Sequence, residues 1–352
     1  RREPAPGYLY SADVCAGVPD LPRERVKYLR VFQQDHTTFS EGTQTTRWGG
    51  PCLSIVLEDG VKRILGTVPV NEDGSVYFQA PAGKMLYFQL LDEHYRALQT
   101  MRSFTGVMPG ETRGCVGCHE MRSTTPPNQP ALALRHLPAT PAPPPWGDES
   151  IGYERFVQPV LDRYCGDCHQ GDGEGRDELN LTLRPGYGFM KEPYLTLVGP
   201  AIWIEPRIAD LTVPDSAKPG VGLAGILRIE SYSPEEIIQK FKWHNQPKSR
   251  GAPAIRTEAL VDKYATLRPM TALSYRSPLI EMVMSGKHYD VKVDPVSLRR
   301  LIAWVDAMGP YRGEDEIRAI PDPEFDGIEE LAIRPRTRTA PKISRPSVMQ
   351  HI

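Results

Sequence analysis

The sequence predicts an α+β protein of several domains, in which a small antiparallel β domain is followed by a mostly helical, loop-rich domain. The 352 residues with 40% hydrophobic content are enough for two or three domains with cores. Short β-branched and aromatic runs stand between residues 26 and 102, whereas capped helical patterns stand in the second half. The 35 prolines and 30 glycines favour short elements joined by loops.

The composition divides the chain into five segments. They are an N-terminal extension (1–25), a β domain (26–125), a proline-rich linker (126–147), a helical cytochrome c-like domain (148–313) and a C-terminal tail (314–352). The linker holds eight prolines between residues 126 and 145, which predicts an extended spacer. The tail is acidic and then basic, and we expect it to lie over the body of the protein.

Five strands are expected in the β domain, separated by turn signals. They run from Val26 to Phe32, Cys52 to Leu57, Val61 to Val68, Val76 to Gln79 and Met85 to Leu91. The turns Asp59-Gly60 and Asn71-Glu72-Asp73-Gly74 are typical of hairpins.

Capping signals predict the helices of the second half. A helix is expected to begin at each of three signals: Ser233-Pro234-Glu235-Glu236, Ser277-Pro278 and Asp294-Pro295. The last two helices are expected to end at Gly286 and at Gly309-Pro310. The residues from Phe156 to Leu161 indicate a further helix, which Pro159 breaks or restarts.

Charge and hydropathy exclude several classes of function. A formal net charge of −2 gives no field that would attract nucleic acid, so no nucleic-acid partner is expected. No apolar run is long enough for a transmembrane segment. The start at Arg1-Arg2-Glu3 indicates that a leader was removed or that the chain begins within a longer protein. Hydrolase signatures are not found.

Two Cys-x-x-Cys-His motifs carry the strongest chemical signal. They are Cys115-Val116-Gly117-Cys118-His119 and Cys165-Gly166-Asp167-Cys168-His169. Two thiols at this spacing add to the two vinyl groups of one porphyrin, and the histidine that follows becomes an axial ligand of the iron. The motifs therefore predict two covalently bound haem c groups, with His119 and His169 as iron ligands. Such haems are attached outside the bacterial cytoplasm, so we expect a periplasmic or otherwise exported protein.

Two other interpretations of the motifs remain open. Four cysteines and two histidines could bind zinc, although structural zinc ligands normally lie within one compact unit and these lie fifty residues apart. They could also be redox dithiols, although such motifs do not require a histidine after each cysteine pair.

The sixth ligands decide between electron transfer and catalysis. His288 is the best candidate for the second haem, because it lies in a short loop between two helices that can pack on the haem, and Met282 or Met284 would be buried on the preceding helix. For the first haem, the nearby candidates have no motif around them, and an open iron face is an alternative; they are His36, His94, His136, Met101 and Met108.

Three further features stay unassigned. His244 could touch a haem, and His351 is a tail residue. Cys15 and Cys52 either form a disulfide or remain two separate thiols.

With these motifs in place, the chain resembles the C-terminal two-thirds of the hydrazine synthase alpha-subunit family. The resemblance rests on residues 62–69, 101–104, 109–111 and 114–120. The second half resembles a planctomycete-type cytochrome c domain at residues 157–162 and 288–292. The resemblance implies a β domain carrying the first haem and a helical domain carrying the second, ligated by His169 and His288. It also implies that a β-propeller precedes this region, with Tyr8 to Asp13 as its last trace.

One position departs from that family. There, a tyrosine shortly after the first motif binds iron, and the motif histidine binds a zinc ion held by the propeller. Ser123 occupies the matching position here. Because serine is a poor substitute for a phenolate, His119 is expected to bind iron directly, and the departure argues against hydrazine synthesis.

The sequence thus predicts an exported dihaem c-type cytochrome that transfers electrons between redox protein partners. A larger complex that contains these partners is a further expectation. The alternative is a haem oxidoreductase that acts on a small nitrogen or oxygen species at an open first haem.

Overall fold

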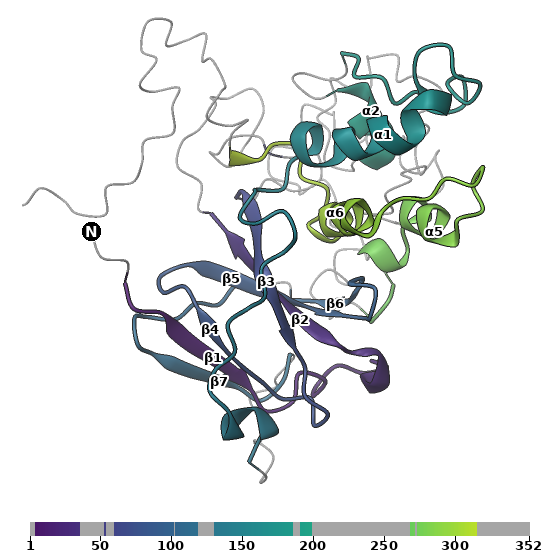
Figure 1. Cartoon of the computed structure of the whole chain (residues 1–352). Helices are drawn as coiled ribbons and strands as arrows, with labels where there is room; N and C mark the ends of the chain where they lie inside the picture. Colours follow the sequence, from purple (N-terminus) through teal and green to yellow (C-terminus); the bar gives the residue numbers. More distant parts are fainter. Residues whose placement is uncertain are drawn as a thin grey trace, which may run out of the picture.

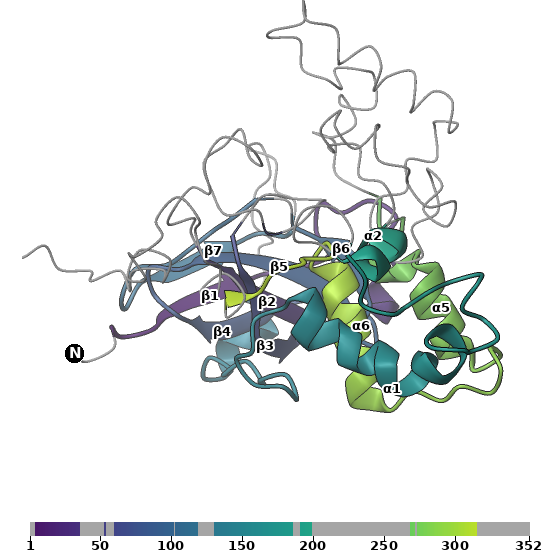
Figure 2. The same ribbon diagram turned by 90° about the horizontal axis from the view of Figure 1, so that it is seen from above.

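The structure is a computed structural model that describes residues 4–35, 53, 60–101, 103–118, 130–185, 191–198, 268–271 and 273–314. Seven strands and several helices are found in these ranges, so the expected α+β class is confirmed. The strands gather in one part of the molecule, and α1, α2, α5 and α6 gather beside them (Figures 1 and 2). Within the described residues, no helix is long and apolar enough to cross a membrane.

The strands form two sheets. The four-stranded sheet is antiparallel throughout and has the order β3-β2-β5-β6. The three-stranded sheet has the order β4-β1-β7, with β1 antiparallel to β4 and parallel to β7. The bounds are β1 Gly7–Ser11, β2 Tyr28–Gln34, β3 Lys62–Pro69, β4 Val76–Ala80, β5 Met85–Leu91, β6 Ala97–Thr100 and β7 Thr112–Cys115.

Four predicted strands correspond to β2, β3, β4 and β5, and the predicted strand from Cys52 to Leu57 lies outside the described residues apart from Leu53. The hairpin expected at Asn71 to Gly74 is wrong. These residues do form a tight turn, in which the Gly74 amide donates to the Asn71 carbonyl at 2.8 Å. However, β3 and β4 belong to different sheets, so the turn leads the chain from one sheet to the other.

Two segments outside the expected β domain also build it. Strand β1 comes from the N-terminal extension and is the central strand of its sheet. The described part of the proline-rich linker (130–147) has a 3-10 turn at Leu132–Arg135 and then runs along the sheets. Thr67 and Ala142 exchange two backbone hydrogen bonds of 2.9 Å, and Ala139 bonds with Tyr77 and Gln79. Proline lacks an amide donor, which explains why this contact is made by its alanines.

The N-terminal caps predicted for two helices are confirmed, whereas the helix that begins after Asp294 ends at Asp306, before the stop expected at Gly309-Pro310. Helix α5 (Pro278–Ser285) begins at Ser277, whose hydroxyl accepts from the Ile280 amide, and ends at Gly286 with a left-handed φ of 61°. Helix α6 (Pro295–Asp306) begins at Asp294, whose side chain accepts from the amides of Val296 and Ser297. Its buried face holds Leu301, Ile302, Trp304 and Val305.

The helix after residue 153 starts irregularly. A π-helical turn over Tyr153–Val157 leads into α1 (Gln158–His169), which has Pro159 in its first turn, so this proline restarts the helix. Helix α2 spans Glu192–Val198. The helix expected after Ser233 lies outside the described residues. A mostly helical second domain is not supported, because α-helices make up less than half of the residues from 148 to 313 that the structure describes.

One core joins the β domain to the helices. Phe32, Ile64 and Tyr87 from the four-stranded sheet pack in the same buried cluster as Phe156 and Trp304. Polar groups cross this interface as well: Lys62 Nζ donates to the Ala307 carbonyl at 3.0 Å, and Arg30 pairs with Asp306 at 2.9 Å. The apolar contact and these buried polar contacts together fix α6 against the sheet.

Candidate functional site

The second Cys-x-x-Cys-His motif forms the last turns of α1. Cys165 and Cys168 are three residues apart on this helix, and His169 is its final residue, so all three side chains project from neighbouring turns. Cys165 is half-buried and Cys168 is exposed. Burial raises the pKa of the Cys165 thiol to about 11.

The His169 ring is held in one orientation by backbone carbonyls. Its Nδ1 lies 3.1 Å from the Gly175 carbonyl oxygen and 2.9 Å from that of Leu179. An N–H at Nδ1 satisfies these acceptors and leaves the Nε2 lone pair available to a metal, which is the usual arrangement of a metal-binding histidine. Gly175 is required here, because a Cβ on it would lie 2.8 Å from Cε1 of His169.

His288 faces His169 from the loop that follows α5. The left-handed Gly286, Tyr289 and Asp290 bend the chain on both sides of it. The two imidazole rings have centroids 6.0 Å apart and planes inclined by 11°. A metal–nitrogen bond is about 2 Å long, and the nitrogen lies about 1.2 Å from the centre of its imidazole ring. Two imidazoles on opposite sides of one metal would therefore have ring centres about 6 Å apart. The spacing of His169 and His288 therefore fits one iron between them.

Further contacts fix the elements around this histidine pair. The Tyr164 hydroxyl on α1 donates to Asp294 Oδ2 at 2.6 Å, at the start of α6. Hydrogen bonds from Ser297 and from Tyr164 lower the pKa of the Asp294 carboxyl. Tyr164, Cys165 and Met284 pack against the buried core, so α1, α5 and α6 hold the pair on a rigid base.

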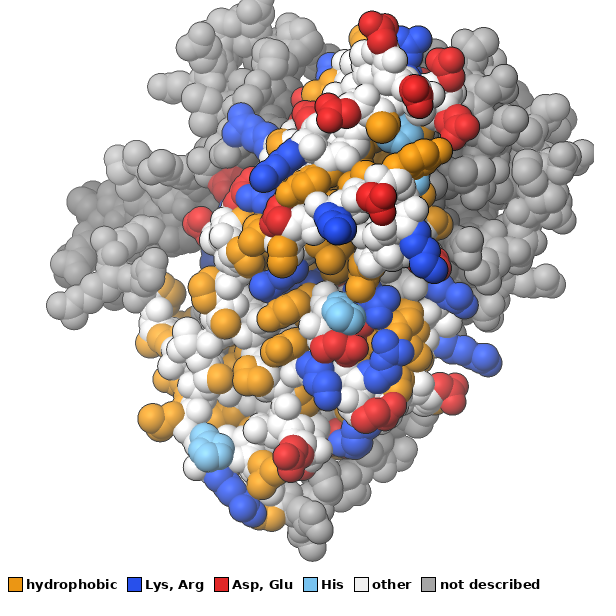
Figure 3. Space-filling model, turned by 45° about the vertical axis from the view of Figure 1, so that its right-hand side comes forward, with side chains coloured by type: hydrophobic (Ala, Val, Ile, Leu, Met, Phe, Trp, Pro, Cys, Tyr) orange, Lys and Arg blue, Asp and Glu red, His pale blue; other side chains and the backbone are white. Residues whose placement is uncertain are grey.

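The surface near the second motif is acidic. Exposed carboxylates follow Cys165 on α1 and in the loop after it: Asp167, Asp172, Glu174, Asp177 and Glu178. Figure 3 shows acidic side chains around histidines in the helical part of the molecule. Tyr289, next to His288, is 84% exposed.

The first motif lies at the end of β7. Cys115 is paired in parallel register with Ser11 of β1, and the Cys115 and Val116 carbonyls accept from the amides of Ala12 and Asp13. A Cβ on Gly117 would lie 2.4 Å from the Ala16 carbonyl oxygen. The residues after β1 thus form the base of the first motif.

Sequence reasoning missed a third thiol at this motif. Burial, together with the neighbouring Cys15 and Cys115, raises the pKa of the Cys118 thiol to about 12. Burial and the Asp13 carboxylate raise that of Cys15 to about 11. The parallel pairing of β1 with β7 brings Cys15 here, and no local sequence signal indicates such a long-range pairing. The Ser11 hydroxyl is buried and without a hydrogen-bond partner in the described part of the chain.

The other candidates are placed as follows. His94 lies exposed in the turn between β5 and β6, as expected, and His136 is exposed in the linker. Met101 packs against the main core, whereas Met108 is 64% exposed. Several predicted residues lie outside the described residues: His36, Cys52, His119, Ser123, His244 and His351.

The donor set of the second motif is described in full and has the chemistry that haem c needs, whereas for the first motif the two thiols are described and His119 lies outside the described residues. The second site offers two thiols and two imidazoles with ring centroids 6.0 Å apart, and the first offers two thiols beside a buried hydroxyl that has no partner among the described residues. In the described ranges, no three histidine, cysteine or acidic side chains are grouped in a way that would hold a bare metal ion.

These features define a two-part α+β protein with a pair of neighbouring histidines beside a Cys-x-x-Cys-His motif. Residues 24–120 match the family model of the hydrazine synthase alpha subunit middle domain. This β domain is thus similar to that of hydrazine synthase, as the sequence predicts.

A solved structure of Kuenenia stuttgartiensis hydrazine synthase is similar to the chain at 17% identity with a TM-score of 0.49. The match covers 87% of this chain and 43% of the hydrazine synthase chain, so the protein spans less than half the length of that relative. No curated protein matches the sequence.

Proposed function

We propose that the protein is an exported dihaem c-type cytochrome that transfers electrons between redox protein partners. The observation that carries the proposal is the pair His169 and His288, with ring centroids 6.0 Å apart and nearly parallel planes. A haem held between two imidazoles accepts and donates single electrons.

The cysteines and histidines of the two motifs, together with His288, have separate roles in this proposal. Cys165 and Cys168 would attach the second haem, and His169 and His288 would occupy both faces of its iron, which leaves no position for a substrate. The carbonyls of Gly175 and Leu179 would fix the His169 tautomer and increase its basicity as a ligand. Cys115, Cys118 and His119 would hold the first haem.

The exposure of Cys168 favours electron exchange at this site. A haem attached through an exposed cysteine would present an edge at the protein surface, where a partner can approach it. The similarity of residues 24–120 to the hydrazine synthase alpha subunit supports a redox context. Export follows from the covalent attachment of haem, which requires an oxidising compartment for maturation.

The test is spectroscopic. The haem-loaded wild type is expected to give low-spin electron paramagnetic resonance signals from the second haem. His288→Gly removes one ligand and should convert that haem to a high-spin form, and added imidazole should restore the low-spin signal. Tyr289→Phe is the matched control, because it changes the exposed neighbour and leaves the ligand.

An unchanged low-spin signal in His288→Gly would overturn the ligand assignment. A high-spin component in the wild type that shifts with hydroxylamine would contradict a pure electron-transfer role. That result would favour the alternative function, an oxidoreductase acting on a small nitrogen or oxygen species at the first haem.

A further inference from the structure

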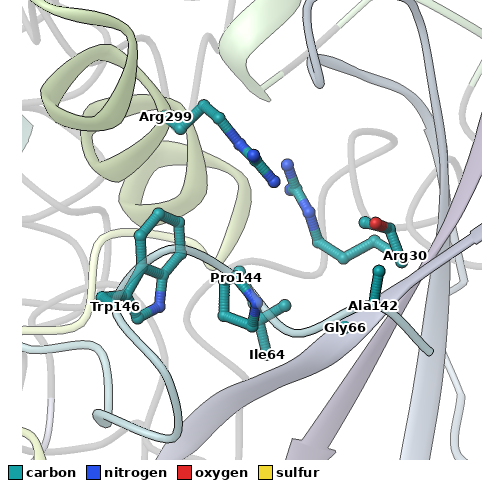
Figure 4. A pocket seen from close by; sticks show the side chains of 8 residues that line it. Arg30, Ile64, Gly66, Ala142, Pro144, Trp146 and Arg299 are labelled. Carbon is teal, nitrogen blue, oxygen red and sulfur yellow. The ribbon is translucent and has the colours of Figure 1, made fainter. Parts of the chain in front are cut away.

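A pocket lies where α6 and the proline-rich linker meet the four-stranded sheet. It has a volume of about 250 Å³, part of it open to solvent, and its interior admits little more than one water-sized species. The described residues that line it include Arg30, Thr67, Trp146 and Arg299, and none of them is acidic. In Figure 4 the guanidinium groups of Arg30 and Arg299 approach each other from the sheet and from α6.

The hydrogen-bond acceptors that balance the positive charge of Arg30 lie on one side of its guanidinium group. Its Nη1 donates to Asp306 Oδ2 and to Gln89 Oε1, both at 2.9 Å, and its Nη2 donates to the Tyr95 carbonyl. These acceptors lie toward the interior, and the side chain is 4% exposed. One carboxylate therefore balances this one buried cation.

Arg299 brings a second positive charge, and no carboxylate of the described residues pairs with it. In the described part of the chain its contact is with the Tyr95 ring, 3.7 Å from the guanidinium carbon to the ring centroid. Burial lowers the pKa of Arg299, and Arg30 adds to that decrease. Because two guanidinium groups repel each other in a partly buried pocket, a negative charge between them would be stabilised.

Trp146 lines the same pocket with its ring. Its indole Nε1 is buried and has no hydrogen-bond partner in the described ranges. The ring is held edge-on against Phe156, with centroids 5.0 Å apart. The packed ring thus forms a fixed apolar side of the pocket.

We propose that this pocket binds a small monovalent anion, a halide or a nitrite-sized oxyanion, that bridges the β domain and α6. The two guanidinium groups supply the charge, and the size of the interior excludes phosphate and larger anions. The close packing of the linker on β3 forms the wall, because a Cβ on Gly66 would lie 2.6 Å from the Ala142 carbonyl oxygen.

Bromide locates the site directly. Crystals of the full chain soaked in sodium bromide should show an anomalous peak between the Arg30 and Arg299 guanidinium groups. In solution, thermal unfolding is followed with sodium chloride, sodium nitrite or sodium phosphate at constant ionic strength. For a Kd of about 10 mM, 100 mM anion raises the folded-to-unfolded ratio about 11-fold, which corresponds to a Tm rise of about 3–6 °C.

The variants separate specific binding from general salt effects. Arg299→Met should abolish the saturable chloride or nitrite effect, whereas Trp146→Phe, which keeps an aromatic ring at the wall, should retain it. Arg135→Met removes an exposed arginine and should leave the effect unchanged. The relative response to chloride and nitrite identifies which anion fits. No bromide peak, water alone at the position, or a Tm response that Arg299→Met retains would overturn the proposal.

Discussion

Replacing Asp306 by alanine should destabilise the protein more than replacing any α6 residue that lies at the surface or at the edge of the core. The Asp306 side chain is fully buried and binds Arg30 at 2.9 Å, the Ser274 amide at 3.0 Å and the Ala97 amide at 3.2 Å. These partners come from β2, β6 and the residues before α5, so one carboxylate joins the β domain to the helices.

The expected loss of folding free energy follows from the unpaired charge that the substitution leaves in the core. Asp306→Ala leaves the Arg30 guanidinium buried without its counter-charge, which typically costs about 3–5 kcal/mol. Against a total stability of about 5–15 kcal/mol, this is a large fraction. At about 2–4 °C for each kcal/mol, the Tm should fall by about 6–20 °C.

Thermal and urea unfolding of four proteins measures the effect. They are the wild type, Asp306→Ala, Arg30→Met and the double variant, with the exposed Asp172→Ala as a control. The double variant should lose about 1–3 kcal/mol less than the sum of the single losses, because the unpaired charge is absent from it. A single-variant loss under about 1 kcal/mol, or strict additivity in the cycle, would refute this account of the interface.

Three further predictions test the helix caps, the histidine support and the thiols. Ser277→Ala removes the acceptor for the Ile280 amide at the start of α5 and should cost about 1 kcal/mol in urea unfolding. Gly175→Ala should displace the His169 ring and shift the low-spin resonance of the second haem. In haem-free protein, Cys118 should react with iodoacetamide very slowly at pH 8 and faster as the pH rises toward its raised pKa of about 12, because the thiolate is the nucleophile.

Each of these predictions has its own control. Ser285→Ala, at the far end of α5, should have a much smaller effect than the cap variant, and equal effects would contradict the cap. Glu174→Ala changes an exposed neighbour of Gly175 and should leave the resonance unshifted. The exposed Cys168 should be alkylated first in haem-free protein; the reverse order, with Cys118 first, would contradict its burial.

Local signals predicted the parts of the fold that depend on nearby residues. The bounds predicted for β5 agree with the structure, because apolar residues of high strand propensity fill it. Helices α5 and α6 begin at Ser277 and Asp294 as expected, since their caps are formed by side chains two or three residues away.

Long-range pairing could not be predicted in the same way. Strands β1 and β7 are short, and each becomes a strand by pairing with a partner about a hundred residues away in the sequence. The turn after β3 looks like a hairpin locally, but the tertiary fold sends β4 to the other sheet. The buried pair of Arg30 and Asp306 depends on the same long-range packing.

The candidate site also has a part that local sequence signals predict and a part that depends on long-range packing. Covalent spacing within each motif is local, so Cys165, Cys168 and His169 could be assigned from the sequence. The choice of His288 rested on its place between two capped helices, and the structure brings its ring to 6.0 Å from that of His169. Cys15 was assigned to a possible disulfide with Cys52, but its position beside Cys118 follows from the β1 and β7 pairing.

The central claim is that both motifs carry covalently bound porphyrin. The pyridine haemochrome spectrum of the purified full chain, measured with its protein concentration after acidified acetone extraction, tests it most directly. The account predicts two haems for each 39.4 kDa chain, with the absorption of thioether-linked haem and no colour in the acetone phase. Stoichiometric zinc with no haem, or haem that passes into the acetone, would contradict it.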